Sequence, residues 1–339
     1  MPIVMARIAA SPYFIANKNL EQKIDSNIME YSIACVVVTY NRKKFLKRCL
    51  DAIVSQSFKP TAVYITDNAS TDGTMDSVKE WGYYECENNG ILFKYILNGK
   101  NEGGAGGFYL GMKTAHNDGD YDGLWVLDDD GEPDVDCLKY LSEHLDHLDY
   151  ISPAVISDED RKTLSFSRDH ISYEEFCKRA DSSGLVYNLA FPFNGVLFSS
   201  HLIDKIGFPK REMFIWGDEL NYNTRALKAN IIPYTVIKAK HYHPVERRKM
   251  EKISENKYVV VDIPDWKLYC SLRNTTYNLR YRKFALLRAP MMAFCTMITY
   301  LNYYNKVKKD SSKNALIVDA IISGLIGRFS GLSKYMQKK

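Results

Sequence analysis

Short apolar runs alternate with amphipathic stretches along the first half of the chain. A run rich in β-branched residues spans 32–39, and a helical pattern follows over 43–57. Further predicted strands span 62–66, 92–97 and 123–127, and further predicted helices span 75–81 and 108–116. Because strands that alternate with helices at this spacing pair in parallel, the pattern predicts an α/β fold with a mostly parallel, Rossmann-like sheet.

Three carboxylates follow the last of these strands directly. Side chains alternate along a strand, so Asp128 and Asp130 are expected on one side and Asp129 on the other. Two carboxylates at the end of a parallel strand repel each other unless a cation lies between them, and oxygen ligands suit Mg²⁺ or Mn²⁺. The triplet therefore predicts a site for a metal-bound diphosphate. The alternative is a solvated Asp cluster at a polar strand end.

Two further loops at the same edge of the predicted sheet are candidates for binding a nucleotide. Four glycines in the segment 101–107 precede a predicted helix, so a phosphate could approach the backbone N–H groups there. This segment does not match the dinucleotide fingerprint, and a simple turn is the alternative. Asp67 lies beside Asn68 and could accept hydrogen bonds from a base or ribose, with Arg42 flanking the same nucleotide. A local Asx-turn is the other interpretation of Asp67.

Acids and imidazoles recur in the second half of the chain. Asp218 and Glu219 open a predicted helix, where only one of them can face a given ligand well, because neighbouring helical residues point about 100° apart. That acid could be a general base beside the metal, and compensation of the helix dipole is the alternative. His241 and His243 end a predicted strand over 234–240 and share a face, so both could enter one cleft. A packing or surface role is the alternative.

Charge is distributed unevenly along the chain. The segment 266–339 carries fourteen Lys and Arg against Asp310 and Asp319, about +12, which leaves about −8 of the overall +4 for the rest. Apolar helical stretches over 284–301 and 315–329 lie within this basic segment. Such helices can lie in a membrane interface, so an anionic membrane surface is an expected partner. Packing on the preceding domain or pairing of two subunits as a homo-oligomer is the alternative.

Cysteine usage and the N-terminus indicate the compartment. Seven Cys without a Cys-x-x-Cys pair fit neither a disulfide framework nor a zinc site, which predicts a reducing environment. Residues 1–30 are expected to form an N-terminal extension that lacks a signal-peptide pattern. No segment reaches the roughly 18 uncharged apolar residues that a spanning helix needs. We therefore expect a cytoplasmic protein, peripheral on the inner face of the cell membrane, with no nucleic acid partner.

In this order the motifs resemble those of inverting family-two glycosyltransferases of GT-A fold. The resemblance covers about 33–244. It rests on Thr39-Tyr40-Asn41-Arg42, Asp67-Asn68-x-Ser70-x-Asp72-Gly73-Thr74, Asn101-x-Gly103-Gly104, Asp128-Asp129-Asp130 and the late acidic pair with a following His. The segments 101–108 and 214–219 are similar to galactofuranosyltransferases and related rhamnosyltransferases that build bacterial surface polysaccharides. The resemblance implies a GT-A (nucleotide-diphospho-sugar transferase) domain over 31–265 and a basic helical C-terminal region over 266–339.

The resemblance also implies roles for individual residues. Asp128, Asp130 and His243 would hold Mn²⁺ or Mg²⁺, and Glu219 would be the base, with Asp218 as its neighbour and fallback. The implied donor-binding residues are Thr39, Asn41, Arg42, Asp67, Asn68, Asn101, Gly103, Gly104, Asp129 and Trp216. Asn221 stands where relatives often carry a second acid, which puts any acceptor contact that needs a charge there in doubt.

The expected activity is a metal-dependent, inverting transfer of a sugar from a nucleotide-sugar donor to a saccharide acceptor, which we expect to be lipid-linked. UDP-galactofuranose is the first choice of donor and dTDP-rhamnose the second. The metal and backbone amides would stabilise the diphosphate leaving group while a carboxylate deprotonates the acceptor hydroxyl. The alternatives are a nucleotidyltransferase, which would leave the late acids without a role, and a non-catalytic module that binds nucleotide-sugar or glycan.

Overall fold

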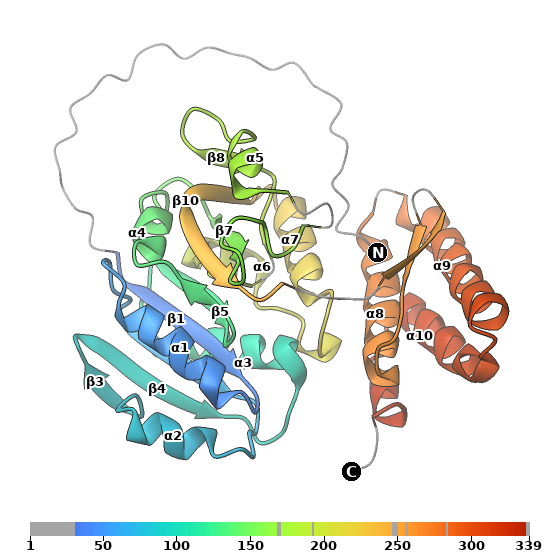
Figure 1. Cartoon of the computed structure of the whole chain (residues 1–339), viewed down its shortest axis with the longest axis horizontal. Helices are drawn as coiled ribbons and strands as arrows, with labels where there is room; N and C mark the ends of the chain where they lie inside the picture. Colours follow the sequence, from blue (N-terminus) through green and yellow to red (C-terminus); the bar gives the residue numbers. More distant parts are fainter. Residues whose placement is uncertain are drawn as a thin grey trace.

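A ten-stranded sheet organises the larger part of the molecule (Figure 1). The computed structural model describes residues 31–167, 171–191, 193–245, 250–254, 257–282 and 284–336, and the expected extension over 1–30 lies outside them. The strands are β1 (Ile33–Thr39), β2 (Ala62–Asp67), β3 (Cys86–Asn88), β4 (Ile91–Leu97), β5 (Gly123–Asp128), β6 (Glu132–Pro133), β7 (Tyr150–Ser157), β8 (Leu185–Tyr187), β9 (Val196–Ser199) and β10 (Tyr234–His243). Their order is β3-β4-β2-β1-β5-β9-β7-β10-β6, with β8 paired to β10.

Parallel pairing brings the ends of three strands to one edge. The strands β4, β2, β1 and β5 are parallel neighbours, and in this register Thr39 pairs with Asp67 while Val38 pairs with Asp128. The strands β7 and β10 are also parallel, and antiparallel β9 joins β5 to β7. The predicted α/β fold with a mostly parallel central sheet is confirmed, and the polar loops after β1, β2 and β5 lie together.

Helices cover both faces of this sheet. They are α1 (Lys43–Val54), α2 (Thr74–Glu80), α3 (Gly103–Asp118), α4 (Cys137–Ser142), α5 (Tyr173–Cys177), α6 (Ser200–Ile206) and α7 (Asp218–Lys228). Alternate residues of β1 enter two separate cores, one with Leu46 and Leu50 of α1 and the other with Phe108 and Met112 of α3. The two-residue repeat of the strand thus places apolar side chains on both faces, as a buried parallel strand requires.

The helix α3 begins earlier than its sequence predicts. Residues 98–107 are expected to be a loop, yet the helix starts at Gly103. A Cβ atom at Gly107 would lie 2.4 Å from Cγ1 of Val38, and one at Gly111 would lie 2.4 Å from Oγ1 of Thr66. The glycines therefore let the helix pack closely on β1 and β2, and this packing outweighs their poor helix propensity.

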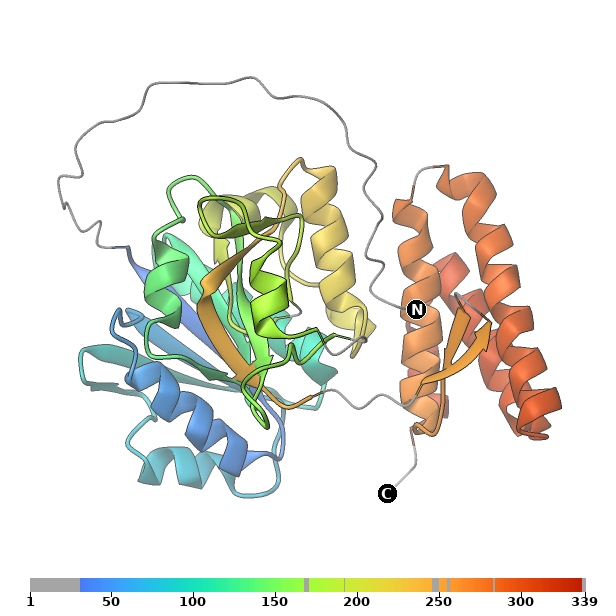
Figure 2. The same cartoon turned by 45° about the horizontal axis from the view of Figure 1, so that its top comes forward.

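A helical group stands beside the sheet in both views (Figures 1 and 2). It contains the hairpin β11 (Met250–Ser254) and β12 (Lys257–Val260) and the helices α8 (Asp265–Asn278), α9 (Ala285–Asn302) and α10 (Asn314–Ile326). These helices share a core that includes Leu268, Leu272, Leu316, Ile317 and Ile321. In both views, α8 is the helix of this group that lies nearest to the sheet. Among the described helices, none combines the length and apolarity needed to cross a bilayer.

Candidate active site

The acid triplet is held from the β1 side. Oγ1 of Thr39 donates a hydrogen bond of 2.6 Å to Oδ2 of Asp129, a buried carboxylate. Nη1 of Arg42 lies 3.3 Å from Oδ1 of Asp129 and 2.6 Å from Oδ2 of Asp130. Because β1 and β5 are parallel neighbours, the residues that follow β1 meet those that end β5. Arg42 therefore contacts the acids directly, and its contact with a nucleotide remains a prediction.

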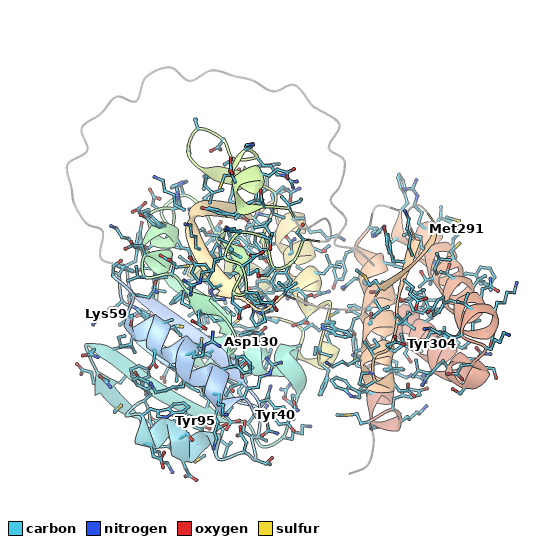
Figure 3. The ribbon with its side chains drawn as sticks, viewed as in Figure 1. Tyr40, Lys59, Tyr95, Asp130, Met291 and Tyr304 are labelled. Atoms are coloured by element: carbon cyan, nitrogen blue, oxygen red, sulfur yellow. The ribbon has the colours of Figure 1, made fainter. Side chains whose placement is uncertain are left out.

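His243 reaches the same acids from the end of β10. Its Nδ1 lies 2.6 Å from the carbonyl oxygen of Pro244, and since a carbonyl only accepts, Nδ1 carries the hydrogen. Nε2 therefore faces the acids, 3.2 Å from Oδ1 of Asp130. This contact is an ion pair when the imidazole is protonated, and it lacks hydrogen-bond geometry, because the buried Oδ1 of Asp130 has no hydrogen-bond partner among the described residues. Figure 3 shows Asp130 within the part of the molecule built on the sheet.

Charge is incompletely neutralised in this acid cluster. Burial raises the pKa of Asp128, and the carboxylates of Asp130 and Asp129 raise it further. Burial also raises the pKa of Asp129, to about 6, although Arg42 opposes the shift. For Asp130, burial is outweighed by His243 and then Arg42, which lower its pKa. A cation beside Asp128 would therefore stabilise its ionised form.

These donors fit a divalent cation. Carboxylates of Asp128 and Asp130 offer hard oxygen ligands, and Nε2 of His243 offers an imidazole nitrogen, a set suited to Mn²⁺ and acceptable to Mg²⁺. Within the described part of the chain, no three side chains of His, Cys, Asp or Glu converge as a preformed ligand set. Asp130 and His243 meet directly, and Arg42 would compete with a cation for Oδ2 of Asp130.

The loops after β1 and β2 are tied together. The backbone N–H of Asn41 donates to Oγ of Ser70 at 2.9 Å, and Oδ1 of Asn41 accepts from the N–H of Thr71 at 2.7 Å. Oδ1 of Asp67 accepts from the N–H of Ser70 at 2.8 Å, and its Oδ2 accepts from the hydroxyl of Tyr95. Asp67 is 1% exposed and its carboxylate bonds to the backbone three residues on, a local structural role like the one that the alternative interpretation gave it, and a contact between Asp67 and a nucleoside remains a prediction.

Asparagines fix the start of α3. Nδ2 of Asn68 donates to the carbonyl of Gly103 at 2.8 Å, and Oδ1 of Asn68 accepts from Asn98 at 3.1 Å. Oδ1 of Asn101 accepts from the N–H of Gly103 at 2.8 Å. A Cβ atom at Gly104 would meet nothing within 4 Å, so the backbone is open there to a ligand. Three predicted donor-binding positions, Asn101, Gly103 and Gly104, therefore lie on one short segment at the helix N-terminus, and a fourth, Asn68, is bonded to it from the loop after β2.

The loop before α7 closes over this segment. The N–H of Ala105 donates to the carbonyl oxygen of Phe214 at 3.1 Å, and a Cβ atom at Gly103 would lie 2.0 Å from that oxygen. Gly103 also has a φ of +70°, which favours glycine. One N–H at the start of α3 is thus bound by protein, and Gly103 is required for the approach of the two loops.

The late acids differ from each other in burial. Both lie in the first turn of α7, and the N–H of Gly217 donates to Oε2 of Glu219 at 3.0 Å. Asp218 is buried, and burial raises its pKa well above the ordinary range, with the neighbouring Glu219 and then Asp128 adding to the shift. Asp218 therefore favours its protonated form. The influence of Asp128 shows that the structure brings the two acid clusters into electrostatic reach of each other.

Trp216 and Asn221 connect this region to α8. Trp216 has a φ of +61°, and Nζ of Lys267 lies 5.4 Å from the centre of its ring. Asn221 is buried, donates from Nδ2 to Oδ1 of Asn278 at 3.0 Å, and accepts from Nε of Arg225 at 3.1 Å. The side-chain amide of Asn221 thus both donates and accepts.

The structure gives His241 the packing role that the sequence left open, and sequence reasoning missed other residues around the site. His241, expected to share a cleft with His243, is buried with its ring against Gly131 and Gly195, and neither ring nitrogen has a hydrogen-bond partner among the described residues. Tyr95 and the polar residues of α8 were also missed. The signal that could have pointed to α8 was a pair of asparagines four residues apart, 274 and 278, on a helix of mixed polar and apolar residues.

Known proteins resemble this chain in sequence and in fold. Residues 34–199 match the family model of Glycosyl transferase family 2. The chain is 32% identical over 222 residues to galactofuranosyltransferase GlfT1 of Mycolicibacterium smegmatis, covering 62% of this chain and 70% of that protein. GlfT1 of Mycobacterium tuberculosis is 32% identical over 224 residues, covering 64% and 71%.

The structure also resembles that of GalNAc-T7, solved with UDP, GalNAc and Mn²⁺. The TM-score is 0.55, the identity is 14%, and the match covers 91% of this chain and 57% of that chain. At this identity the likeness concerns the fold.

Proposed function

The chain belongs to glycosyl transferase family 2 and has the GT-A fold, and from this premise we propose that it is a metal-dependent, inverting galactofuranosyltransferase. The observation that supports this most is an acid cluster at the carboxyl edge of the sheet, paired with Arg42 and His243, whose Asp128 acts electrostatically on a second acid pair at the start of α7. The similarity to GlfT1 favours UDP-galactofuranose as the donor, with dTDP-rhamnose as the second choice.

Asp128, Asp130 and Nε2 of His243 are the groups that would hold Mn²⁺ or Mg²⁺. When bound, such an ion supplies positive charge to a diphosphate leaving group. Arg42 adds a guanidinium at the same carboxylates, and its ion pair with Asp130 fixes its place there. On the side of the β1 end away from Arg42, the segment from Asn101 to Gly104 would bind the donor through its backbone groups.

We assign Glu219 as the general base. Burial raises the pKa of Asp218, so Asp218 keeps a proton and is poorly suited to accept another. The N–H of Gly217 fixes one carboxylate oxygen of Glu219. The acceptor oxygen bonds to the anomeric carbon, the bond from that carbon to the diphosphate breaks, and the hydroxyl proton passes to Glu219. A single displacement of this kind inverts the anomeric carbon.

A membrane surface is the partner we propose for α9. The apolar residues Leu286 and Leu287 of this helix are 94% and 81% exposed. Figure 3 shows Met291 on the same helical group, away from Asp130. The sequence contains no acid between Asp265 and Asp310 but nine Lys and Arg. This combination fits an anionic lipid surface, such as the cytoplasmic face of a cell membrane that presents a lipid-linked saccharide acceptor.

A screen of sugar nucleotides tests the proposed activity. Wild-type protein is incubated with UDP-galactofuranose, dTDP-rhamnose and other sugar nucleotides, with Mn²⁺, Mg²⁺ or EDTA, and release of nucleotide is measured. We expect slow, metal-dependent release of UDP from UDP-galactofuranose even without an acceptor. Release from dTDP-rhamnose alone would change the donor, whereas binding of nucleotides without any turnover would favour a non-catalytic module.

A further inference from the structure

The segment that leads into α7 has an unusual backbone. Phe214, Trp216 and Gly217 have φ values of +67°, +61° and +94°. Residues other than glycine rarely have a positive φ. Such a backbone conformation persists only when the surrounding structure holds it in place. Glu219 follows two residues later, so the forces that hold this segment also decide where its carboxylate lies.

Polar side chains of α8 hold that segment through its carbonyl groups. Nδ2 of Asn274 lies 2.9 Å from the carbonyl oxygen of Met213, 3.0 Å from that of Ile215 and 2.7 Å from that of Trp216. Nδ2 of Asn278 donates to the carbonyl of Gly217 at 2.9 Å. Two asparagines one helical turn apart thus face four carbonyl groups of the segment.

Arg273 adds a buried cation to the same contact. Its Nη2 donates to the carbonyl of Met213 at 2.8 Å, and its Nε donates to Oδ1 of Asn274 at 2.9 Å. Both Arg273 and Asn274 are 0% exposed, and burial lowers the pKa of Arg273. Burying a guanidinium opposes folding unless its N–H donors are hydrogen-bonded. An apolar residue in the same place would often pack equally well. Its carbonyl contacts therefore indicate a role in holding the segment.

Gly217 transmits this support to Glu219. Its carbonyl accepts from Asn278 at 2.9 Å, and its N–H donates to Oε2 of Glu219 at 3.0 Å. A Cβ atom at Gly217 would lie 3.2 Å from Cβ of Asn274, so the residue has little room to shift toward α8. A single residue, Gly217, therefore links an α8 side chain to the carboxylate of Glu219 through its two flanking peptide groups.

We propose that Asn278, supported by Asn274 and Arg273, is a positioning residue for Glu219, so that α8 is part of the active-site framework. The inference rests on the proposed role of Glu219 as the base. Asn278 touches no reacting atom in this account. It sets the place of Gly217, and Gly217 sets the orientation of the carboxylate.

Asn278→Ala is the variant that tests this proposal, with turnover measured as release of UDP from UDP-galactofuranose and Mn²⁺. A small displacement of a catalytic group can cost up to about a hundredfold in rate, so we expect kcat to fall by at least about tenfold. The KM for the donor should change by less than about twofold, because the side chain of Asn278 bonds to Gly217 and Asn221, neither of which is a predicted donor-binding residue. Loss of kcat and donor affinity together would indicate a general structural defect and overturn the proposal.

Tyr269→Phe is the matched control. It removes a buried hydrogen bond of 3.1 Å to Ser323 inside the same helical group and leaves the carbonyl groups of the segment untouched. We expect it to lower the melting temperature while keeping wild-type kcat. An equal loss of kcat in both variants would show that turnover merely follows the stability of the helices. Should Asn278→Ala fail to fold, Asn278→Ser replaces it in every comparison.

The double variant with Glu219→Gln separates this inference from the proposed function. Because Asn278 acts through Glu219, the double variant should lose no more turnover than Glu219→Gln alone. Losses that multiply would overturn the positioning role. Wild-type turnover in Glu219→Gln would instead show that the proposed base is wrong. A loss of turnover in Glu219→Gln together with wild-type kcat in Asn278→Ala would overturn the positioning role alone.

Discussion

The two acid clusters of the site are built from the same chemistry but supported in opposite ways. Asp129 and Asp130, at the end of β5, are paired with Arg42, and Asp130 also with His243. At the start of α7, Glu219 accepts a hydrogen bond from the N–H of Gly217, and burial together with Glu219 raises the pKa of Asp218. The first cluster is suited to binding a cation, whereas the second is suited to binding a proton.

The roles that we propose for these carboxylates differ because their local structures differ. The strand β5 ends at Asp128, so Asp129 and Asp130 follow in a turn and are not projected to opposite sides as expected, and Arg42 from the neighbouring β1 loop reaches both. A helix N-terminus provides backbone N–H groups and partial positive charge without bringing a basic side chain. The roles proposed for the two clusters follow from these supports, and substitutions in each should produce different losses.

The largest effect is expected from Glu219→Gln. The variant cannot accept the acceptor proton, and a positioned base typically contributes at least about a hundredfold, so turnover should fall by that factor while donor affinity stays close to wild type. Steady-state kinetics with a parallel binding titration measure both. The control is Asp218→Asn, which should retain most activity. If the two variants behave in the reverse way, the roles of the acids must be exchanged.

A smaller effect is expected from Asp130→Ala and His243→Ala. Each removes one proposed metal ligand, so the Mn²⁺ concentration for half-maximal activity should rise by at least about tenfold. A titration of activity with Mn²⁺ measures this. His116 and Asp204 form an ion pair with the same 3.2 Å separation elsewhere on the molecule, and their alanine variants are the controls. Wild-type activity of both site variants at limiting Mn²⁺ would mean that the metal site is wrongly assigned.

A third effect concerns stability and pH. Burial raises the pKa of folded Asp218 above that of the unfolded chain, so the folded state binds the extra proton. The free energy of unfolding should therefore decrease as pH rises from about 4 toward the raised pKa, by at most about 1.4 kcal/mol per pH unit. Urea unfolding of wild type and Asp218→Asn from pH 4 to pH 7 measures this, and the variant should lack this contribution. Identical pH profiles would contradict the raised pKa.

The smallest effect is expected on the outer surface of the helical group. The double substitution Leu286→Glu and Leu287→Glu should weaken sedimentation with anionic vesicles by about tenfold, because it removes apolar area and adds like charge at the lipid. Raised ionic strength should release the wild-type protein. Leu92→Glu, on an exposed position of β4, is the control. A change in oligomeric mass without a change in vesicle binding would assign this face to a second subunit.

Point variants suit that experiment better than removal of 266–339. The contacts of Arg273, Asn274 and Asn278 with the segment before α7 mean that truncation would also release the support of Glu219. The boundary near 265 is close to the start of α8 at Asp265. The division into a catalytic domain and a separate C-terminal region nevertheless remains a prediction, because these contacts cross it.

The sequence allowed the sheet and the acid triplet to be predicted because their signals are local. Apolar β-branched runs define buried strands, and three carboxylates at a strand end define a cluster. The start of α3 was missed because glycine propensity argues against a helix, and only the packing against Val38 and Thr66 decides it. The second partner of Asp67, Tyr95, lies 28 residues away and has no local signal.

The polar face of α8 was missed for the same physical reason. Its partners lie about 60 residues earlier in the chain, and they are backbone carbonyls, which leave no trace in the residue types. Within a strongly basic segment, an arginine and two asparagines look like solvent-exposed positions. Their burial depends on the docking of α8 against α7, which no periodicity in the sequence indicates.

The separation of cation binding from proton transfer is tested most directly by measuring donor binding and turnover together in Asp130→Asn and Glu219→Gln. Titrations with UDP-galactofuranose at limiting and saturating Mn²⁺ would be paired with UDP release under the same conditions. We expect Asp130→Asn to lose metal-dependent donor binding at limiting Mn²⁺ and to recover it at saturating Mn²⁺. Glu219→Gln should bind the donor as wild type does, but its turnover should be at least about a hundredfold slower at both Mn²⁺ concentrations. Loss of both properties in both variants, independent of Mn²⁺, would contradict this separation.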